Sequence, residues 1–159
     1  MADMKQIASK DYDKVSDYFI KFFENKRYGY LDPYTSQVSE FSAFYVKDNM
    51  FNYRRLYYTN ESFTEIICLK LRKKPFNSLA IDIIFFDVAL DDGFVGKLNT
   101  VFDDIKLNYE EISKININLL EKESSDLTCF LQELNFECEV TYSDELGFGK
   151  NVLVYSRLL

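Results

Sequence analysis

Two stretches of the sequence carry side chains that could do chemistry. Asp82 is a single carboxylate within the apolar run Leu79–Leu90, and the acidic stretch Asp91–Gly93 follows directly. In a strand Asp82 shares a face with Ile84 and Phe86, because side chains alternate. Burial among such neighbours raises the pKa of a carboxyl group toward the range useful for acid–base chemistry. The alternative is a residue at a strand end that faces solvent or a neighbouring hydroxyl.

The composition excludes several other kinds of site. The chain has no histidine, so no mechanism can use an imidazole base, and a zinc site would need carboxylates and thiols alone. The three cysteines, Cys68, Cys129 and Cys138, lie far apart within apolar runs. This spacing favours reduced thiols in the core over a disulfide framework or a metal site. We therefore expect no metal.

The net charge of −7 limits the kind of partner. Nucleic acids and anionic membranes bind proteins mainly through lysine and arginine, so we expect neither as a partner. The one basic cluster, Arg72–Lys74, is typical of a solvated turn. A cationic or amine-bearing partner fits this chain better. The sequence has neither a long apolar run nor a signal-like N-terminus, which predicts a cytoplasmic protein.

The elements that must position these residues follow from the spacing of apolar side chains. A chain of 159 residues, 47% apolar and 17% aromatic, predicts a single domain, 1–159, with an aromatic core. A short strand at Lys5–Ser9 precedes a helix that ends near Asn25, and a second helix ends around Asp48–Asn49. Between the two helices lies a turn with glycine and proline, Arg27–Pro33.

The rest of the chain alternates strands and helices. Three strands predict an antiparallel meander, and the strand-helix-strand unit that follows predicts a right-handed parallel crossover. The order β-α-α-β-β-β-α-β-α-β-β describes an α/β fold of the layered α+β kind, with a mixed, mostly antiparallel central sheet and about four helices. The expected strands are Tyr53–Thr59, Phe63–Leu71, Leu79–Leu90 and Ile115–Leu120, and the third helix carries Val95 to Ile105.

The end of the sequence resembles a known family. The amphipathic segment Ser125–Leu134 leads into Asn135–Val140 and then into Val152–Leu158. This pattern resembles the closing helix and hairpin of GCN5-related N-acetyltransferases (GNAT). In that family Asn-x-x-Ala and Phe-Tyr-x-x-x-Gly-Phe precede two strands, the second ending in a run like Val-Tyr-x-Arg-Leu. The expected element order is also that of the GNAT fold, so the resemblance covers nearly the whole chain.

The resemblance implies an acetyl-CoA site where the fourth strand meets the third helix. In the family a Val-x-Pro-Glu stretch leads into Arg/Gln-x-x-Gly-x-Gly/Ala, whose amides hold the pyrophosphate. Aligning Gly96 with the final glycine puts Val88 at the proline, Asp91 at the Arg/Gln and Phe94 at the first glycine. We expect Phe94 to crowd the backbone and the acids to repel phosphate, so that binding is weak or lost. An ordinary acidic helix start is the alternative. The cofactor-binding residues that the resemblance implies are Phe86, Asp91, Phe94, Val95, Gly96, Lys97, Leu98 and Ser124.

The resemblance also assigns catalytic roles. Many family members use a glutamate on the fourth strand as the base, and that place falls on Asp82. The usual acid is a tyrosine on the fourth helix, but Leu131 stands there and cannot give a proton. Tyr142 or Tyr155 could supply a hydroxyl from a neighbouring strand. A thiolate is a tolerable leaving group, so an acid is not strictly required.

Two functions remain open from the sequence. One is acetyl transfer from acetyl-CoA to an amine, either a small molecule or a basic peptide. Its acceptor would lie between segments 27–34 and 142–150, which carry tyrosines and the acids Asp32, Asp144 and Glu145. For these side chains the alternative is an aromatic rim with solubilising acids. The second function is a GNAT-like module without catalysis that binds a partner, with a homodimer through exposed strands or its aromatic surface as one form.

Overall fold

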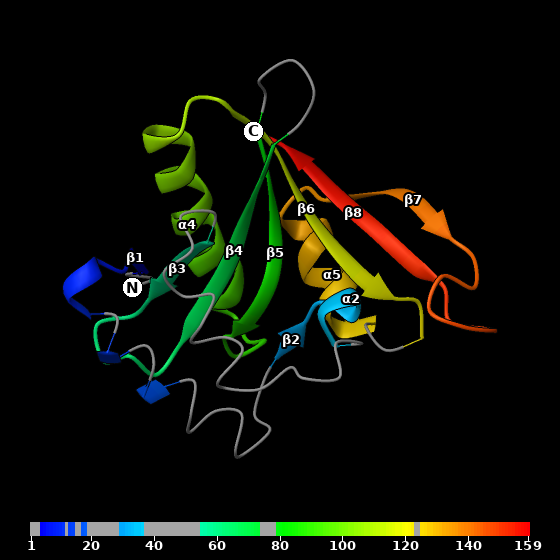
Figure 1. Ribbon diagram of the computed structural model, residues 1–159, viewed down its shortest axis with the longest axis horizontal. Helices are drawn as coiled ribbons and strands as arrows, with labels where there is room; N and C mark the ends of the chain where they lie inside the picture. The colour runs from blue at the N-terminus through cyan, green and yellow to red at the C-terminus, as the bar shows by residue number, and fades with distance from the viewer. Residues whose placement is uncertain are drawn as a thin grey trace.

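A twisted eight-stranded sheet organises the molecule, with strand order β1-β3-β4-β5-β6-β8-β7 and β2 added at β5 (Figure 1). The computed structural model describes residues 4–11, 13–14, 17–18, 29–36, 55–73, 79–122 and 125–159. The strands are β1 Lys5–Gln6, β2 Tyr30–Leu31, β3 Arg55–Thr59, β4 Ile66–Lys73, β5 Leu79–Asp87, β6 Ile112–Leu120, β7 Glu137–Tyr142 and β8 Val152–Leu158. The helices are the 3-10 turn η1 Ser9–Asp11, α2 Pro33–Ser36, α4 Phe94–Asn108 and α5 Ser125–Glu133.

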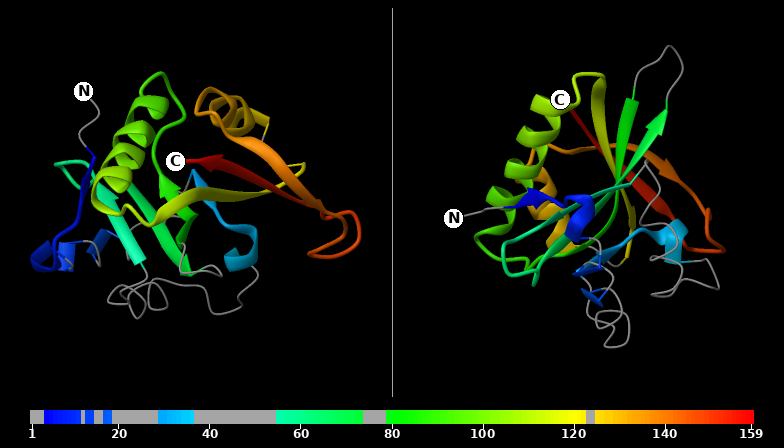
Figure 2. Two further views of the ribbon diagram at one scale, coloured as in Figure 1. Left: turned by 90° about the horizontal axis from the view of Figure 1, so that it is seen from above. Right: turned by 60° about the vertical axis from the view of Figure 1, so that its left-hand side comes forward.

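The two long helices cover one face of the sheet. Figure 2 shows α4 and α5 on the same side of the sheet, with α2 and η1 on the other. Apolar residues of α4 recur at helical spacing and are fully buried against the sheet, among them Leu98 and Phe102. A smaller cluster, Tyr57, Ile66, Cys68 and Phe85, forms separately from this main core. The sheet is thus packed on both faces.

Most of the predicted order is confirmed. The meander β3-β4-β5 is antiparallel, and β5 and β6 pair in parallel around α4. The strand β2 lies inside the turn 27–33 and was not predicted. The two helices expected before β3 fall mostly outside the described residues; of the described residues before β3, 13–14, 17–18 and 33–36 are α-helical. The described residues therefore contain two long helices rather than about four. In this part of the chain no helix is long and apolar enough to cross a membrane.

The prediction that Asp82, Ile84 and Phe86 share one face of the strand is wrong for Phe86, because the strand is irregular at Ile84. The register between β4 and β5 shifts there, so that Cys68 faces Phe85 while Leu69 faces Ile83, and Ile84 is the extra residue of a β-bulge. A bulge reverses the alternation of side chains. Phe86 consequently packs in the main core with Ile81 and Ile83, whereas Phe85 packs in the smaller cluster. Asp82 and Phe86 lie on opposite faces.

The cysteines are also placed differently from the prediction. All three are free thiols, as expected, but only Cys68 is buried, while Cys129 and Cys138 are exposed. Burial raises the pKa of the Cys68 thiol to about 11, so this thiol is protonated and unreactive at neutral pH.

Candidate active site

The parallel strands β5 and β6 separate partway along their length. They pair from Leu79 with Ile112 to Asp82 with Asn116, and the described residues form no further pair between them. Beyond Asp82, β5 pairs instead with β2, through Tyr30 with Phe86 and Leu31 with Phe85. We call the region beyond the Asp82–Asn116 pair the strand divergence. Ligands of open α/β sheets commonly bind where neighbouring parallel strands part at their carboxyl ends.

The residues Gly29–Asp32, here called the inserted segment, occupy the strand divergence. Figure 1 shows β2 between the ends of β5 and β6. Gly29 N donates to Phe86 O at 3.2 Å, and Asp32 N donates to Ile84 O at 2.7 Å. On the other side, Tyr30 Oη donates to Asn118 O of β6 at 2.6 Å. The inserted segment thus bridges the two strands where they no longer contact each other.

Asp82 stands at the last pair before the strands part. Its carboxylate is held by the Arg72 guanidinium, with Nη2–Oδ1 and Nε–Oδ2 both 3.0 Å, and by Asn116 Nδ2 at 3.3 Å. Burial raises the pKa of Asp82, while Arg72 and Asn116 oppose that rise. The side chain is 17% exposed. The predicted direction of the shift is confirmed, although its polar neighbours come from β4 and β6.

A second carboxylate lies in the strand divergence. Asp32 is 4% exposed and accepts a hydrogen bond from Asn118 Nδ2 at 3.0 Å. Its negative charge contributes to raising the pKa of Asp82 and that of Tyr30. Two acidic groups close enough to interact, with donors from two asparagines, make a polar centre able to hold a cation or to move a proton.

The phenol of Tyr30 stays protonated in this setting. Burial raises its pKa well above the usual value, and the charge of Asp32 adds to the rise. A group with such a pKa donates a hydrogen bond and does not act as an acid at neutral pH.

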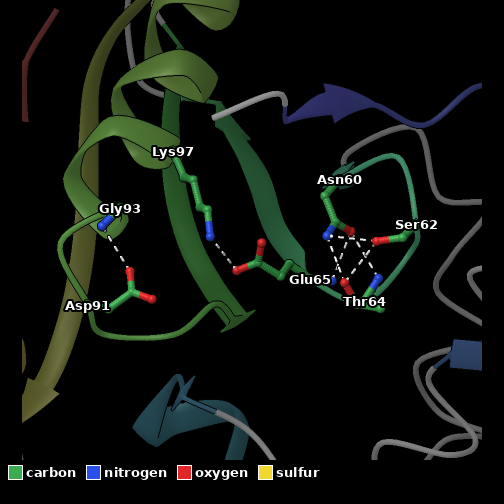
Figure 3. Close-up of polar contacts among 7 residues, drawn as sticks. All are labelled: Asn60, Ser62, Thr64, Glu65, Asp91, Gly93 and Lys97. Carbon is green, nitrogen blue, oxygen red and sulfur yellow. Dashed lines mark hydrogen bonds and ion pairs between the residues drawn. The ribbon is translucent and has the colours of Figure 1, made fainter. Parts of the chain in front are cut away.

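The turn before α4 is closed by its own residues. Asp91 Oδ1 accepts from Gly93 N at 2.9 Å, and Asp91 O accepts from Phe94 N at 3.1 Å, as Figure 3 shows for the side chain. This matches the ordinary acidic helix start that the sequence left open. The amides of Val95 and Gly96 have no acceptor inside the helix, because first-turn N–H groups lack one.

Phe94 was expected to crowd this turn, and that expectation was wrong. The ring is fully buried and packs on Phe86 and Phe130, with ring centroids 5.3 Å apart in both pairs. Its side chain points into the core because the helix begins there and turns its first apolar residue inward. Leu98 is likewise fully buried, and Val95 packs partly against the same core. Gly96 is exposed.

Lys97 is committed to an ion pair within the protein. Its Nζ lies 2.8 Å from Glu65 Oε2, and both side chains are about one-fifth exposed, 21% and 19%. Glu65 lies at the end of the β3–β4 turn. In this turn Asn60 Oδ1 accepts hydrogen bonds from the amides of Thr64 and Glu65 (Figure 3). A phosphate at the start of α4 would therefore compete with Glu65 for Lys97.

The two segments expected to line an acceptor pocket do meet. Tyr34 Oη of α2 donates to Glu145 Oε1 at 3.3 Å, which joins segment 27–34 to the β7–β8 loop. Asp144 shapes that loop instead of facing the strand divergence, since its Oδ1 accepts from Gly149 N at 2.6 Å. Phe148, at the tip, is 99% exposed.

The remaining predicted residues take no part in the polar centre. Leu131 is fully buried in the core, and Tyr155 packs there too at 9% exposure. Tyr142 is 45% exposed on the edge strand β7. Ser124 lies outside the described residues.

The sequence analysis missed the amides and the guanidinium around Asp82. Asn116 and Asn118 alternate with isoleucines along β6, a period of two that puts both amides on one face. This pattern could have indicated a polar face opposite the helices. Nothing local indicated that Arg72 and Tyr30 would reach the same place.

A cleft of about 560 Å³ lies elsewhere, between β6, β8 and β7. Its charged groups include Lys114 and Glu139, which form an ion pair. None of the predicted site residues lines it. The lining residues are Lys114, Asn135, Glu137, Cys138, Glu139, Ser156, Arg157 and Leu158.

Several solved structures that resemble this chain over its full length are acetyltransferases. The aminoglycoside 6'-N-acetyltransferase of Enterococcus faecium matches with a TM-score of 0.69 at 7% identity, over 98% of this chain and 96% of its own. NAA60 of Arabidopsis thaliana, in complex with acetyl-CoA, gives 0.65 at 6% identity over 99% of both chains. The ribosomal-protein-S5-alanine acetyltransferase of Vibrio fischeri gives 0.61 at 12% identity, over 98% and 91%.

Further full-length matches are described as acetyltransferases of the GNAT family. The sequence itself matches no protein-family model. It matches no curated protein either.

Proposed function

The chain has a divergent GNAT fold over its whole length, and from this premise we propose that it transfers an acetyl group from acetyl-CoA to an amine. One observation carries the proposal beyond the fold: a carboxylate whose pKa is raised by burial stands where β5 and β6 part. Perturbed carboxylates at such places suit proton transfer.

In the proposed reaction the amine nitrogen attacks the thioester carbonyl carbon. The new C–N bond forms, the C–S bond breaks, and the sulfur leaves as the CoA thiolate. Before attack the acceptor ammonium gives up one proton to Asp82, because only the neutral amine is nucleophilic, and the second proton that the nitrogen loses as the amide forms passes to solvent. For this step Arg72 must loosen its hold on one carboxylate oxygen. No residue of the described site is assigned as an acid, since the thiolate can leave without one.

Acetyl-CoA would approach at the start of α4, where the amides of Val95 and Gly96 are available. Two features weaken this site: Asp91 uses the amide of Gly93, and Glu65 holds Lys97. We therefore propose weak binding. The neighbours in complex with coenzyme A or acetyl-CoA support the choice of donor.

The acceptor is proposed to be an amine carried by a small molecule or a basic peptide. Asp32 and Asp82 provide negative charge near the strand divergence, and Tyr34 lies beside it at the β7–β8 loop. Neighbours of the same fold act on an aminoglycoside in one case and on a protein alanine in another, so both acceptor kinds are compatible with this fold.

A second candidate is a non-catalytic module of the same fold. The bidentate hold of Arg72 on Asp82 and the inserted segment both favour it, because each occupies a group that catalysis needs free. Such a module would bind a partner, or a second copy of itself, without turnover.

Titration calorimetry with acetyl-CoA and with CoA separates the two candidates. Saturable binding, together with a thermal shift at millimolar ligand, is expected for the transferase. Release of CoA thiol is then measured with a panel of amines, for the wild type and for Asp82→Asn. The variant should bind acetyl-CoA as the wild type does and lose most turnover. Absence of both heat and shift would leave the non-catalytic module.

A further inference from the structure

The ring of Tyr30 lies on the helix side of the strand divergence. It stacks on Phe86 with the centroids 5.3 Å apart and the planes at 23°, and it belongs to the main core together with residues of α4 and α5. Phe86 in turn contacts Phe94, and Phe94 contacts Phe130 of α5. A continuous row of four aromatic rings therefore runs from the inserted segment, past β5, to α5.

The inserted segment also uses the hydrogen-bonding edge of β5. The carbonyls of Phe86 and Ile84 already accept from Gly29 N and Asp32 N, and Tyr30 Oη holds the carbonyl of Asn118 on β6. An extended ligand that pairs with a strand edge needs such groups open. With Tyr30 at 7% exposure and Asp32 at 4%, these positions are closed to solvent as well.

The fit of the segment is close at its first residue. A Cβ at Gly29 would lie 3.3 Å from a Phe86 ring carbon and 3.3 Å from Val88 O. These distances are shorter than ordinary van der Waals contact, so a larger residue at this position would push Phe86 or the Val88 carbonyl away by a few tenths of an ångström. The segment is a fitted part of the fold.

We propose that the inserted segment is an autoinhibitory plug, which must leave the strand divergence before the acyl arm of acetyl-CoA can lie between β5 and β6. This inference rests on the proposed function, since it specifies how that site is closed. A ligand held at the first turn of α4, which follows β5 in the chain, and extending between β5 and β6 to Asp82 would lie along the stretch that Gly29–Asp32 now occupies. Displacement breaks the β2–β5 pairing together with the bonds from Gly29 N and Asp32 N to β5, the hydrogen bonds of Tyr30 and Asp32 with Asn118, and the stack of Tyr30 on Phe86.

Hydrogen exchange provides a direct test. The amides of Gly29 and Asp32 are protected by their bonds to β5, so acetyl-CoA at millimolar concentration should speed their exchange, read from a peptide that spans 29–34. Slower or unchanged exchange at these amides, with acetyl-CoA demonstrably bound, would overturn the plug.

Two variants loosen the plug in different ways. Tyr30→Phe keeps the ring and removes the hydrogen bond to Asn118 O, and Gly29→Val crowds the backbone against Phe86. Each should bind CoA more tightly, Tyr30→Phe by about two- to tenfold, the equivalent of one hydrogen bond. Tyr109→Phe is the matched control, because its hydroxyl bonds Gln6 at the C-terminal end of α4, and its affinity should stay unchanged. Circular dichroism verifies that each variant is folded. If Gly29→Val does not fold, Tyr30→Phe alone provides the test.

The outcomes separate this proposal from the proposed function. Tighter binding without any thiol release supports the plug and contradicts acetyl transfer. Equal binding by the wild type and Tyr30→Phe contradicts the plug and leaves acetyl transfer standing. If neither protein binds CoA or acetyl-CoA, both proposals fall.

Discussion

The turn before α4 and the strand divergence differ in how far their parts lie apart in the sequence. At the turn, Asp91, Gly93 and Phe94 bond one another within a few residues. At the divergence, Tyr30, Asp82 and Asn118 come together from segments up to 88 residues apart. The conformation of the turn is set by residues close in sequence. The arrangement at the strand divergence forms only when distant strands pair in the folded sheet.

The difference also extends to charge. The turn satisfies its own donors with Asp91, and Lys97 with Glu65, so it offers little free positive charge. The divergence collects two carboxylates: burial and the charge of Asp32 raise the pKa of Asp82, while Arg72 and Asn116 oppose that rise. The first region is electrostatically closed, and the second holds a group able to accept a proton.

The largest expected effect is at Phe94, where the two regions meet. Phe94→Ala removes a fully buried ring between Phe86 and Phe130, so the free energy of unfolding should fall by about 3–5 kcal/mol. Urea denaturation measures this. Phe148→Ala, at a ring 99% exposed, is the control and should change stability by less than about 0.5 kcal/mol. Similar small losses of stability in both variants would contradict the burial of the Phe94 ring in the core.

Removing the amide that supports Asp32 should have the next largest effect. Asn118→Ala takes away a donor from a carboxylate only 4% exposed, at a cost of about 1–3 kcal/mol. Asn108→Ala is the matched control, because that amide bonds Asp104 on an exposed helix surface. Equal losses of stability in the two variants would show that the buried Asn118–Asp32 hydrogen bond contributes no more than the exposed Asn108–Asp104 hydrogen bond.

The pair Arg72–Asp82 predicts a pH-dependent effect. Arg72→Met should cost about 1 kcal/mol at pH 7, since Arg72 is itself 53% exposed. Without Arg72 the folded-state pKa of Asp82 rises further above the unfolded value. The loss is therefore full at a pH above the folded-state pKa of Asp82 in the variant, and it disappears once the pH falls below the folded-state pKa of Asp82 in the wild type, which burial holds above the usual value.

Urea denaturation at pH 7 and pH 4 tests this dependence. In the double variant Arg72→Met with Asp82→Asn, the contribution of position 82 to the pH dependence of the free energy of unfolding should vanish, because this side chain no longer titrates. A loss that stays constant between the two pH values would mean that the guanidinium acts through packing alone.

The smallest effect belongs to the turn. Asp91→Ala should cost about 0.5 kcal/mol through the lost, exposed bond from Gly93 N, whereas Asp91→Asn keeps an acceptor and should cost less. Thermal unfolding of both variants measures the difference. A larger loss for the asparagine variant than for alanine would contradict this role of the Asp91 side chain in the turn.

Much of the fold could be predicted, because apolar periodicity is a local signal. The meander, the crossover around α4 and the closing helix and hairpin all appear where spacing placed them. The prediction failed at β2, since two residues are too few for a period, and at the β-bulge of Ile84, since the extra residue is fixed by pairing with β4. These two features, β2 and the β-bulge, determine which side chains lie on each face of the sheet near Asp82.

The same division holds for the site itself. That Asp82 is the carboxylate of a strand and that Asp91 lies in the turn just before a helix follow from the sequence alone, because neighbouring residues set them. Which groups surround Asp82, where Phe94 points and what occupies the gap between β5 and β6 were decided by tertiary structure. Burial and strand pairing bring Arg72, Asn116 and Tyr30 to one place, and no local pattern encodes contacts between such distant segments.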